Sequence, residues 1–174
     1  MKTLALLVPI LLLSACAQPE IHKYDSPYYK IPVGSSLTLN QDIIIPAGQA
    51  RTLIQYGKMV AKRNQIDQYY PWCEFEVRTL NEEDQVIQPD QFRISRLSKE
   101  FRYSSRSIMY ASLADNDYSR LIGYATVMYL QSDKQPDVYR MTCLYWTDDN
   151  LDDHLSKNQI SDTMGQVFSL EIAR

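Results

Sequence analysis

Cysteine and histidine are the side chains of this chain best suited to covalent or metal chemistry. The 174 residues include three cysteines, Cys16, Cys73 and Cys143, and two histidines, His22 and His154. A thiol nucleophile needs a positive or basic neighbour that lowers its pKa, yet the two histidines lie in a proline-containing N-terminal segment and in an acidic stretch. A zinc site normally uses four closely spaced nitrogen or sulfur ligands, and the sequence has no CxxC or HxxxH. The spacing therefore argues against a thiol enzyme and a zinc site, and leaves Cys73 as half of a disulfide or a small buried residue.

Carboxylates are concentrated in "WTDDNLDDH", residues 146–154. Asp148, Asp149 and Asp152 are the side chains there that could hold Ca²⁺. An EF-hand loop would need acidic residues at alternate positions, a central glycine and a closing glutamate, and this stretch lacks that order. A solvated acidic loop that leads into a helix is the preferred interpretation, and we expect neither a metal nor a cofactor.

A second pair of carboxylates, Glu74 and Glu76, lies in "PWCEFEVR", residues 71–78. Side chains two residues apart on a strand share a face at about 6–7 Å, a separation compatible with glycosidase chemistry. Arg78 continues the same row, so alternating charges on a solvent-facing side explain the pattern without chemistry. The sequence also has no GxSxG, HExxH or SxxK, which are common hydrolase motifs. We therefore do not expect an enzyme.

The N-terminus has the build of a secretory signal. Met1, Lys2 and Thr3 give a short basic start, and Leu4 to Leu13 form an apolar run that ends in small residues. A helix of this length spans only about 15 Å, half of the hydrocarbon core of a bilayer, so the run is too short for a transmembrane anchor. We predict a signal peptide over residues 1–15.

The end of this run resembles the lipobox of bacterial lipoproteins. Leu13, Ser14, Ala15 and Cys16 match all four of its positions. The resemblance covers only the leader, and it implies that Cys16 is acylated and becomes the N-terminus. Because position 17 is not aspartate, the chain is also similar to lipoproteins that are sent to the outer membrane of Gram-negative bacteria, on its periplasmic face. The alternative is a soluble exported protein cut near Ala15 or Ala17.

The compartment that this resemblance implies bears on the other two cysteines. In an oxidising envelope, an isolated pair of thiols in a small exported domain is expected to be oxidised. Alternation places Cys73 on the same side of a strand as Phe75 and Val77, and Cys143 beside Met141 on the apolar side of another strand. We therefore predict a disulfide between Cys73 and Cys143.

Short alternating segments dominate the chain after residue 35. They predict one globular domain, residues 35–174, with a mainly β fold: a single antiparallel sandwich or partly closed barrel of about seven to eight short strands and a short C-terminal helix. Residues 16–34 contain three prolines and are predicted to be a lipidated, flexible tether. Turn and cap residues predict a hairpin at Pro46 to Gln49, a second hairpin around residues 131–137, and a helix from Asn158 to Met164 that ends at Gly165.

Aromatic residues give the one predicted binding surface. The chain has 13 tyrosines, and exposed Tyr and Trp provide contact area at little entropic cost. In "QYYPW", Tyr69, Tyr70 and Trp72 flank the strand predicted from Trp72 to Thr79 and form a candidate patch for a protein or a glycan. The alternative is that they are half-buried residues of a sheet.

Charge and location together set the expected function. The net charge of −3 leaves no excess of Lys and Arg for a nucleic-acid backbone, so the expected partners are the membrane, through the lipid, and an envelope protein or glycan. The sequence predicts a non-catalytic binding or envelope-assembly role. One alternative is a ligand-binding β-barrel whose cavity is lined by Phe75, Val77 and Met141 and holds an apolar or glycan molecule. A cell-wall hydrolase would instead need a cleft at Asp152, His154 or Glu76.

Overall fold

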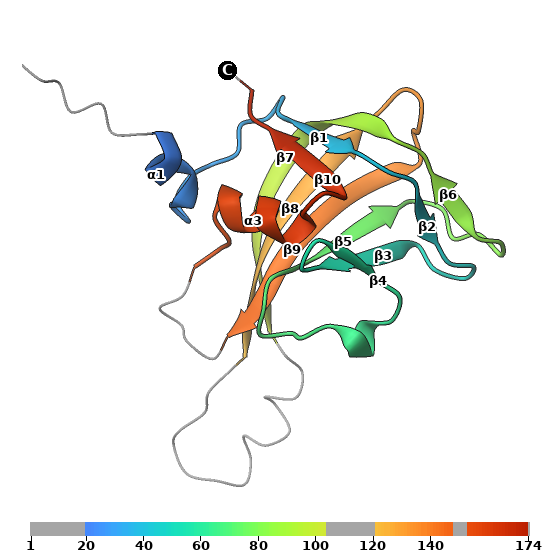
Figure 1. The fold of residues 1–174 in the computed structure, drawn as a ribbon, viewed down its shortest axis with the longest axis horizontal. Coiled ribbons are helices and arrows are strands. Elements are labelled where there is room, and N and C mark those ends of the chain that lie inside the picture. The colour runs from blue at the N-terminus through green and yellow to red at the C-terminus, as the bar shows by residue number, and fades with distance from the viewer. Residues whose placement is uncertain (1–19, 104–120, 148–152, 174) are drawn as a thin grey trace, which may run out of the picture.

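A curled antiparallel sheet forms the body of the protein. The computed structural model describes residues 20–103, 121–147 and 153–173. Within these residues eight strands form one sheet in the order β10-β1-β7-β8-β9-β5-β3-β4, and two more form a small separate sheet, β2-β6. Figure 1 shows the main sheet curling into a partly closed barrel, which confirms the predicted mainly β architecture. The bounds are β1 Ser36–Leu39, β2 Ile43–Ile45, β3 Arg51–Gln55, β4 Lys58–Val60, β5 Trp72–Val77, β6 Gln85–Ile87, β7 Asp90–Tyr103, β8 Ile122–Gln131, β9 Val138–Thr147 and β10 Phe168–Glu171.

The three longest strands, β7, β8 and β9, form a meander at the centre of the sheet. The predicted second hairpin is confirmed as β8 and β9, which pair from Ile122↔Thr147 to Tyr129↔Arg140. Their β-branched and aromatic residues suit a pleated surface that is covered on both faces. The β7–β8 ladder shifts register between Ile94 and Arg96, and such a bulge increases the local bend of a strand.

The main core lies on one face of the sheet, which we call the main-core face. Phe75 is fully buried there, and its ring centroid lies 5.9 Å from that of Phe92 and 5.2 Å from that of Phe168. Val77 and Met141 belong to the same buried cluster. The face that the barrel alternative assigns to a ligand cavity is therefore packed with protein side chains.

The opposite face, which we call the second face, is also covered, and this corrects the prediction for β5. Trp72 packs with Leu53, Ala125 and Leu144 in a small second core and is only 1% exposed. Glu74 and Glu76, predicted to face solvent, are buried on the same side of β5. Alternation distinguishes the two faces of a strand but does not reveal that both are covered.

The predicted hairpin at Pro46 to Gln49 is correct as a turn and wrong as a strand pair. The N–H of Gln49 donates to the carbonyl of Pro46 at 3.0 Å, and Gly48 has a φ of +70°. The strands on either side nevertheless separate: β2 pairs with β6, and β3 pairs with β4 and β5. The turn therefore carries the chain from one sheet to the other.

The C-terminal helix follows its prediction closely. Helix α3, Lys157–Met164, begins after Ser156, whose side chain accepts a hydrogen bond from the N–H of Gln159 in a capping box. It ends at Gly165, with a φ of +56°, and it packs against β10, β5 and β3. A Cβ on Gly165 would lie 2.5 Å from the Cα of Gly57, so the helix end and the β3–β4 turn meet backbone to backbone.

Most of the predicted tether, residues 20–34 of 16–34, packs on the folded domain. Helix α1, Glu20–Asp25, lies beside α3. The ammonium of Lys99 donates to the carbonyl of Pro27 at 2.6 Å, and Ile31 is buried in the main core. A flexible spacer would leave these groups in solvent. Across the described ranges, no helix is long and apolar enough to cross a membrane.

Candidate functional site

A buried carboxylate on the second face is surrounded by arginines from three elements. The side chain of Glu74 on β5 is 1% exposed, and its Oε1 accepts a hydrogen bond from Arg63 at 2.9 Å. Its Oε2 lies 3.5 Å from the guanidinium of Arg51 and 3.7 Å from that of Arg102. Such charge-assisted contacts compensate the loss of water around a buried carboxylate. We call these four residues the arginine cluster.

Each arginine reaches Glu74 because of its place in the fold. Arg51 begins β3 and lies directly opposite Glu76 on β5, one row from Glu74. Arg63 belongs to the 3₁₀ helix η1, Arg63–Gln65, and its guanidinium lies 5.1 Å from the centre of the Trp72 ring. The guanidinium of Arg63 thus makes a cation–π contact with the buried indole of Trp72.

Arg102 comes from β7, which is separated from β5 by two strands. Gly123 on β8 lies opposite Arg102, and a Cβ on this glycine would lie 3.2 Å from the Cβ of Arg102 and 3.3 Å from the ring of Trp146. Because Gly123 has no side chain, the side chain of Arg102 can lie close to the sheet and reach Glu74.

The charges of the arginine cluster do not balance. One carboxylate faces three guanidiniums, and guanidinium is protonated at any physiological pH. The side chains of Arg51 and Arg63 are 49% and 61% exposed, so part of each donor fork faces solvent. The cluster therefore presents about two unbalanced positive charges at the surface.

The neighbouring pair on the same face is balanced. Both Nε and Nη2 of Arg140 donate to Oε2 of Glu76, at 3.1 and 3.0 Å. Burial alone would lower the pKa of Arg140, but the hydrogen bonds and the charge of Glu76 outweigh it and raise this pKa above its usual value. Glu76 is thus held as an ion-pair partner, in a different environment from a free catalytic carboxylate.

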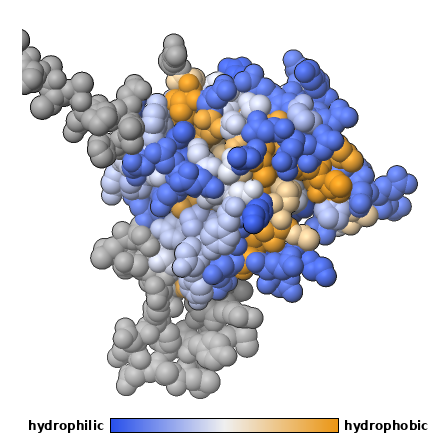
Figure 2. All heavy atoms as spheres, in the orientation of Figure 1, coloured by the Kyte–Doolittle hydropathy of each residue, from blue (hydrophilic) through white to orange (hydrophobic). Residues whose placement is uncertain are grey.

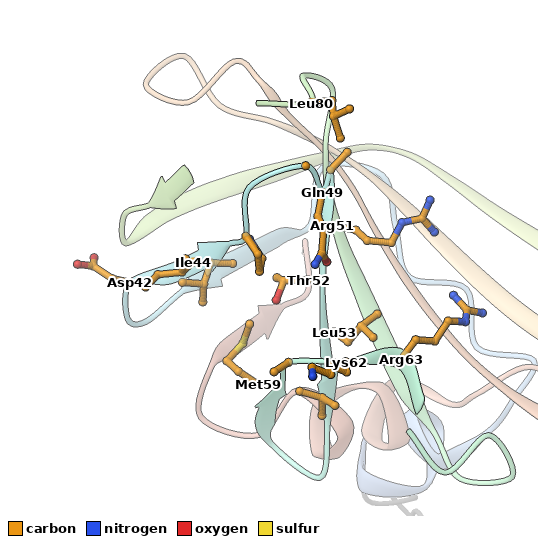
Figure 3. Close-up of a pocket in the computed structure, with 16 residues that line it drawn as sticks. Asp42, Ile44, Gln49, Arg51, Thr52, Leu53, Met59, Lys62, Arg63 and Leu80 are labelled. Atoms are coloured by element: carbon orange, nitrogen blue, oxygen red, sulfur yellow. The ribbon is translucent and has the colours of Figure 1, made fainter. Parts of the chain in front are cut away.

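Next to the arginine cluster, a groove of about 910 Å³ crosses the edge of the main sheet. Its lining includes the apolar Ile44, Met59 and Leu80 and the basic Arg51 and Lys62, together with Asp42, Thr52, Leu53 and Arg63. We call it the edge groove. Figure 3 shows Arg51, Leu53 and Arg63 on one side of β3, and Ile44, Thr52 and Met59 on the other. Figure 2 shows apolar side chains reaching the surface in this region among hydrophilic ones. The groove is therefore cationic on one side and mainly apolar on the other, where Thr52 and Asp42 are its polar residues.

The edge groove exposes an uncovered stretch of strand β3. The edge strand β4 pairs only with Leu53, Ile54 and Gln55, so it ends before Arg51. The two strands are joined by Tyr56 and Gly57, with φ values of +53° and +70°, as in a two-residue type I′ hairpin. In such a hairpin the N–H and C=O groups of Gln55 and Leu53 point toward β4, and the alternation of the ladder sends those of Arg51 to the same edge.

The predicted disulfide is confirmed. Cys73 and Cys143 lie directly opposite each other on β5 and β9, with their Cα atoms 4.1 Å apart, and their sulfurs are bonded. Both residues are fully buried in the main core. The bond therefore joins two central strands and is remote from any surface chemistry.

Two residues of the predicted aromatic patch lie at the surface, as such a patch requires, and the third does not. Tyr69 and Tyr70 are exposed, but Trp72 is buried in the second core. The exposed neighbour of Tyr70 is instead Tyr56, with ring centroids 6.0 Å apart. Trp72 follows a proline and is the first residue of β5, so its side chain belongs to the sheet and not to the preceding loop.

Two of the residues considered for metal binding or hydrolysis, Glu76 and His154, are described by the structure, and they lie in separate environments. Cys16, Asp148, Asp149 and Asp152 lie outside the described residues. His154 is buried, with its ring centroid 5.3 Å from that of Phe101 and 5.5 Å from that of Tyr124. Burial, and then the charge of Lys99, lower the pKa of His154 below its usual value. Glu76 is engaged with Arg140, as described above.

Sequence reasoning missed the arginine cluster because its members are scattered. Arg51, Arg63 and Arg102 are isolated arginines in segments with no shared motif. The one local signal was Glu74 itself, an acid between Cys73 and Phe75 in a strand that also begins with Trp72. Large apolar residues on both faces of one strand indicate a central strand, and an acid there needs cationic partners.

Comparisons of this chain with protein-family models, curated proteins and solved structures find no match.

Proposed function

We propose that this chain is a lipoprotein anchored by Cys16 in the outer membrane, on its periplasmic face, and that its role there is to bind another envelope protein without catalysis. The observation that carries the binding role is the edge groove, with an open strand edge, an apolar side and an unbalanced cationic side. The anchor rests on the match of residues 13–16 to the lipobox. A buried disulfide also suits an oxidising compartment.

The basic groups of the edge groove favour binding over chemistry. Arg51, Lys62 and Arg63 are cations at neutral pH, so they can attract and orient an anionic group but do not serve as general bases. The apolar side supplies surface that gains from being buried against a partner. A protein chain carries both apolar and anionic side chains, together with the backbone groups that an open strand edge can pair with.

Site-specific photo-crosslinking in intact cells tests the binding role. A photoreactive amino acid at Lys62 or Ile44 is expected to give a covalent adduct with an envelope protein, identified by mass spectrometry. The matched control is the same amino acid at Asp162, an exposed residue of α3 outside the groove. The adduct at Lys62 should disappear when Arg51→Glu and Arg63→Glu are combined. Absence of a protein adduct from both groove positions would refute the binding role.

Metabolic labelling with palmitate tests the anchor. The chain should incorporate the label and fractionate with outer membranes, and Cys16→Ser should lose the label and leave the membrane fraction. The paired variant Cys73→Ala/Cys143→Ala serves as the control and should retain the label, because only Cys16 is the acylated residue. Continued labelling and membrane attachment of Cys16→Ser would refute the assignment.

A further inference from the structure

We infer that the edge groove binds an extended acidic segment of the partner, which pairs with β3 as an additional antiparallel strand in line with β4. This inference rests on the proposed protein-binding role and names the chemistry that the same groove recognises. Three observations carry it: the open edge of β3, the two unlike sides of the groove, and the charge of the arginine cluster.

The open edge fixes how the segment would lie. β4 runs antiparallel to β3 and ends opposite Leu53, so no strand of the described residues pairs with β3 at Arg51 on this edge. A segment that continues the line of β4 would place one residue directly opposite Arg51. In an antiparallel ladder these two residues exchange both of their N–H to C=O hydrogen bonds. Backbone pairing of this kind gives affinity that does not depend on the partner's side chains.

The two sides of the groove fix which side chains fit. Successive residues of a strand point to opposite faces, and residues opposite each other across a ladder share a face. The residue opposite Arg51 would therefore lie on the side of Arg51 and Arg63, and its neighbours along the segment would lie on the side of Ile44 and Met59 (Figure 3). The segment that suits the groove alternates acidic and apolar residues.

The positive charge of the arginine cluster predicts that the segment bound in the groove is negatively charged. Glu74 holds Arg63 at 2.9 Å but Arg51 only at 3.5 Å, and both side chains remain largely exposed. A carboxylate arriving opposite Arg51 would lower the excess of the arginine cluster from about two positive charges to about one, without removing the buried ion pair. Carboxylate and guanidinium can form two parallel hydrogen bonds. A basic segment would meet two uncompensated charges of its own sign.

Fluorescence anisotropy with a defined peptide tests this mode of binding. The probe is a labelled, acetylated and amidated eight-residue peptide of alternating glutamate and valine, and the protein is the full chain purified from bacterial envelopes in detergent. The matched peptide has glutamine at every glutamate position. We expect the glutamate peptide to bind at least about tenfold more tightly, and the difference to shrink as salt is raised. Equal affinity of the two peptides would overturn the acidic preference.

N-methylated peptides test the strand pairing separately. A glutamate opposite Arg51 has its side chain on the same face as Arg51 and directs its backbone N–H and C=O toward β3. Because backbone direction alternates along a strand, the amides of the glutamates face β3 and those of the valines face away. N-methylation of the glutamates should weaken binding at least about tenfold, whereas N-methylation of the valines should leave it nearly unchanged. Equal effects of the two modifications would overturn the antiparallel pairing.

Protein variants place the peptide in the groove. Arg51→Gln and Arg63→Gln should each lower the affinity for the glutamate peptide about tenfold and hardly change that for the glutamine peptide. Arg78→Gln is the matched control, because Arg78 lies over the ring of Tyr139, at 4.6 Å, and does not line the groove. The circular dichroism spectrum checks that each variant is folded. An Arg78→Gln loss as large as that of the groove variants would overturn the location.

Other occupants are separated by two further measurements. Binding to anionic phosphatidylglycerol vesicles that competes with the peptide would show that the groove takes a membrane surface, and dimerisation in sedimentation experiments that Arg51→Gln abolishes would show that it takes a second copy of the chain. Either result overturns the inference. If Lys62 crosslinks an envelope protein but the peptides do not bind, the inference fails and the proposed function stands. If the peptides bind and no protein is crosslinked, the proposed function fails.

Discussion

Arg63 and Glu74 form a 2.9 Å ion pair between a side chain that is 61% exposed and one that is 1% exposed. The arginine keeps most of its water, while the carboxylate has lost nearly all of its own. The guanidinium also lies over Trp72, so the same residue covers the second core and pairs with the buried Glu74. The pair therefore links the stability of β5 to the charge of the edge groove.

The first prediction concerns Glu74→Gln. Without the carboxylate, three arginines face one another without compensation, and we expect the free energy of unfolding to fall by about 2 kcal/mol, a figure kept modest because the arginines are partly solvated. Urea denaturation followed by circular dichroism measures this. Glu82→Gln, at an exposed position, is the control and should change stability by less than about 0.5 kcal/mol. A Glu74→Gln variant as stable as the control would refute the compensating role.

The second prediction concerns the disulfide between Cys73 and Cys143. The bond closes a chain segment with a sequence separation of 70, which corresponds to about 4 kcal/mol in the chain-entropy treatment. The double variant Cys73→Ala/Cys143→Ala should lose stability of this order, and a reducing agent should destabilise the wild-type chain but leave the variant unaffected. Denaturant unfolding with and without dithiothreitol makes the comparison. Mass mapping that finds both thiols free in envelope material would contradict the bond.

The third prediction compares two glycines with positive φ. Gly165→Ala would place a Cβ 2.5 Å from the Cα of Gly57, whereas a Cβ on Gly48 meets nothing within 4 Å. Gly48→Ala should cost only the strain of a left-handed conformation, about 1 kcal/mol, and Gly165→Ala should cost clearly more because backbone must also move. Thermal unfolding of the two variants measures the difference. Equal losses would show that the α3–turn contact adjusts freely.

The fourth prediction concerns His154 and pH. Its pKa in the folded chain lies below the usual 6.5, first because of burial and then because of Lys99, although Asp153 and the backbone at Ala125 act in the opposite direction. Protonation therefore favours the unfolded chain: the contribution is complete above about pH 6.5 and is lost as the pH falls through the lowered value. The wild-type melting temperature should fall between pH 7.5 and pH 5.0.

Two variants check that His154 causes this fall. His154→Phe should show a smaller pH effect, because an aromatic ring is kept and the buried Nδ1, which has no partner among the described residues, is removed. His22→Gln changes the other histidine of the chain and should behave like the wild type. An unchanged pH effect in His154→Phe would refute the assignment.

The fold class and the C-terminal helix could be predicted because each depends on local signals, and the disulfide because alternation was combined with the cysteine count and the expected oxidising compartment. Alternation placed Cys73 and Cys143 on inward faces, and Ser156 and Gly165 marked the ends of α3. The partner of β2 was missed because pairing with β6 joins residues forty or more positions apart, and a turn alone does not decide whether its flanking strands stay together.

The candidate site was harder to predict, since it depends on contacts between distant segments. From the sequence, Glu74 was assigned to a solvent-facing row, because its partners Arg63 and Arg102 lie on other elements, η1 and β7. Trp72 looked like an exposed anchor until Leu53 and Leu144 covered it. In both cases the strand was identified correctly, and the error lay in what packs against its second face.

The folded N-terminal segment has a consequence for where a partner can be met. Helix α1 begins at Glu20, so an acylated Cys16 is separated from it by four residue steps, at most about 14 Å of extended chain. A flexible spacer through residue 34 would instead have allowed about 60 Å. Under the proposed acylation, the folded domain begins within about 14 Å of its lipid anchor, so a partner is met close to the membrane surface.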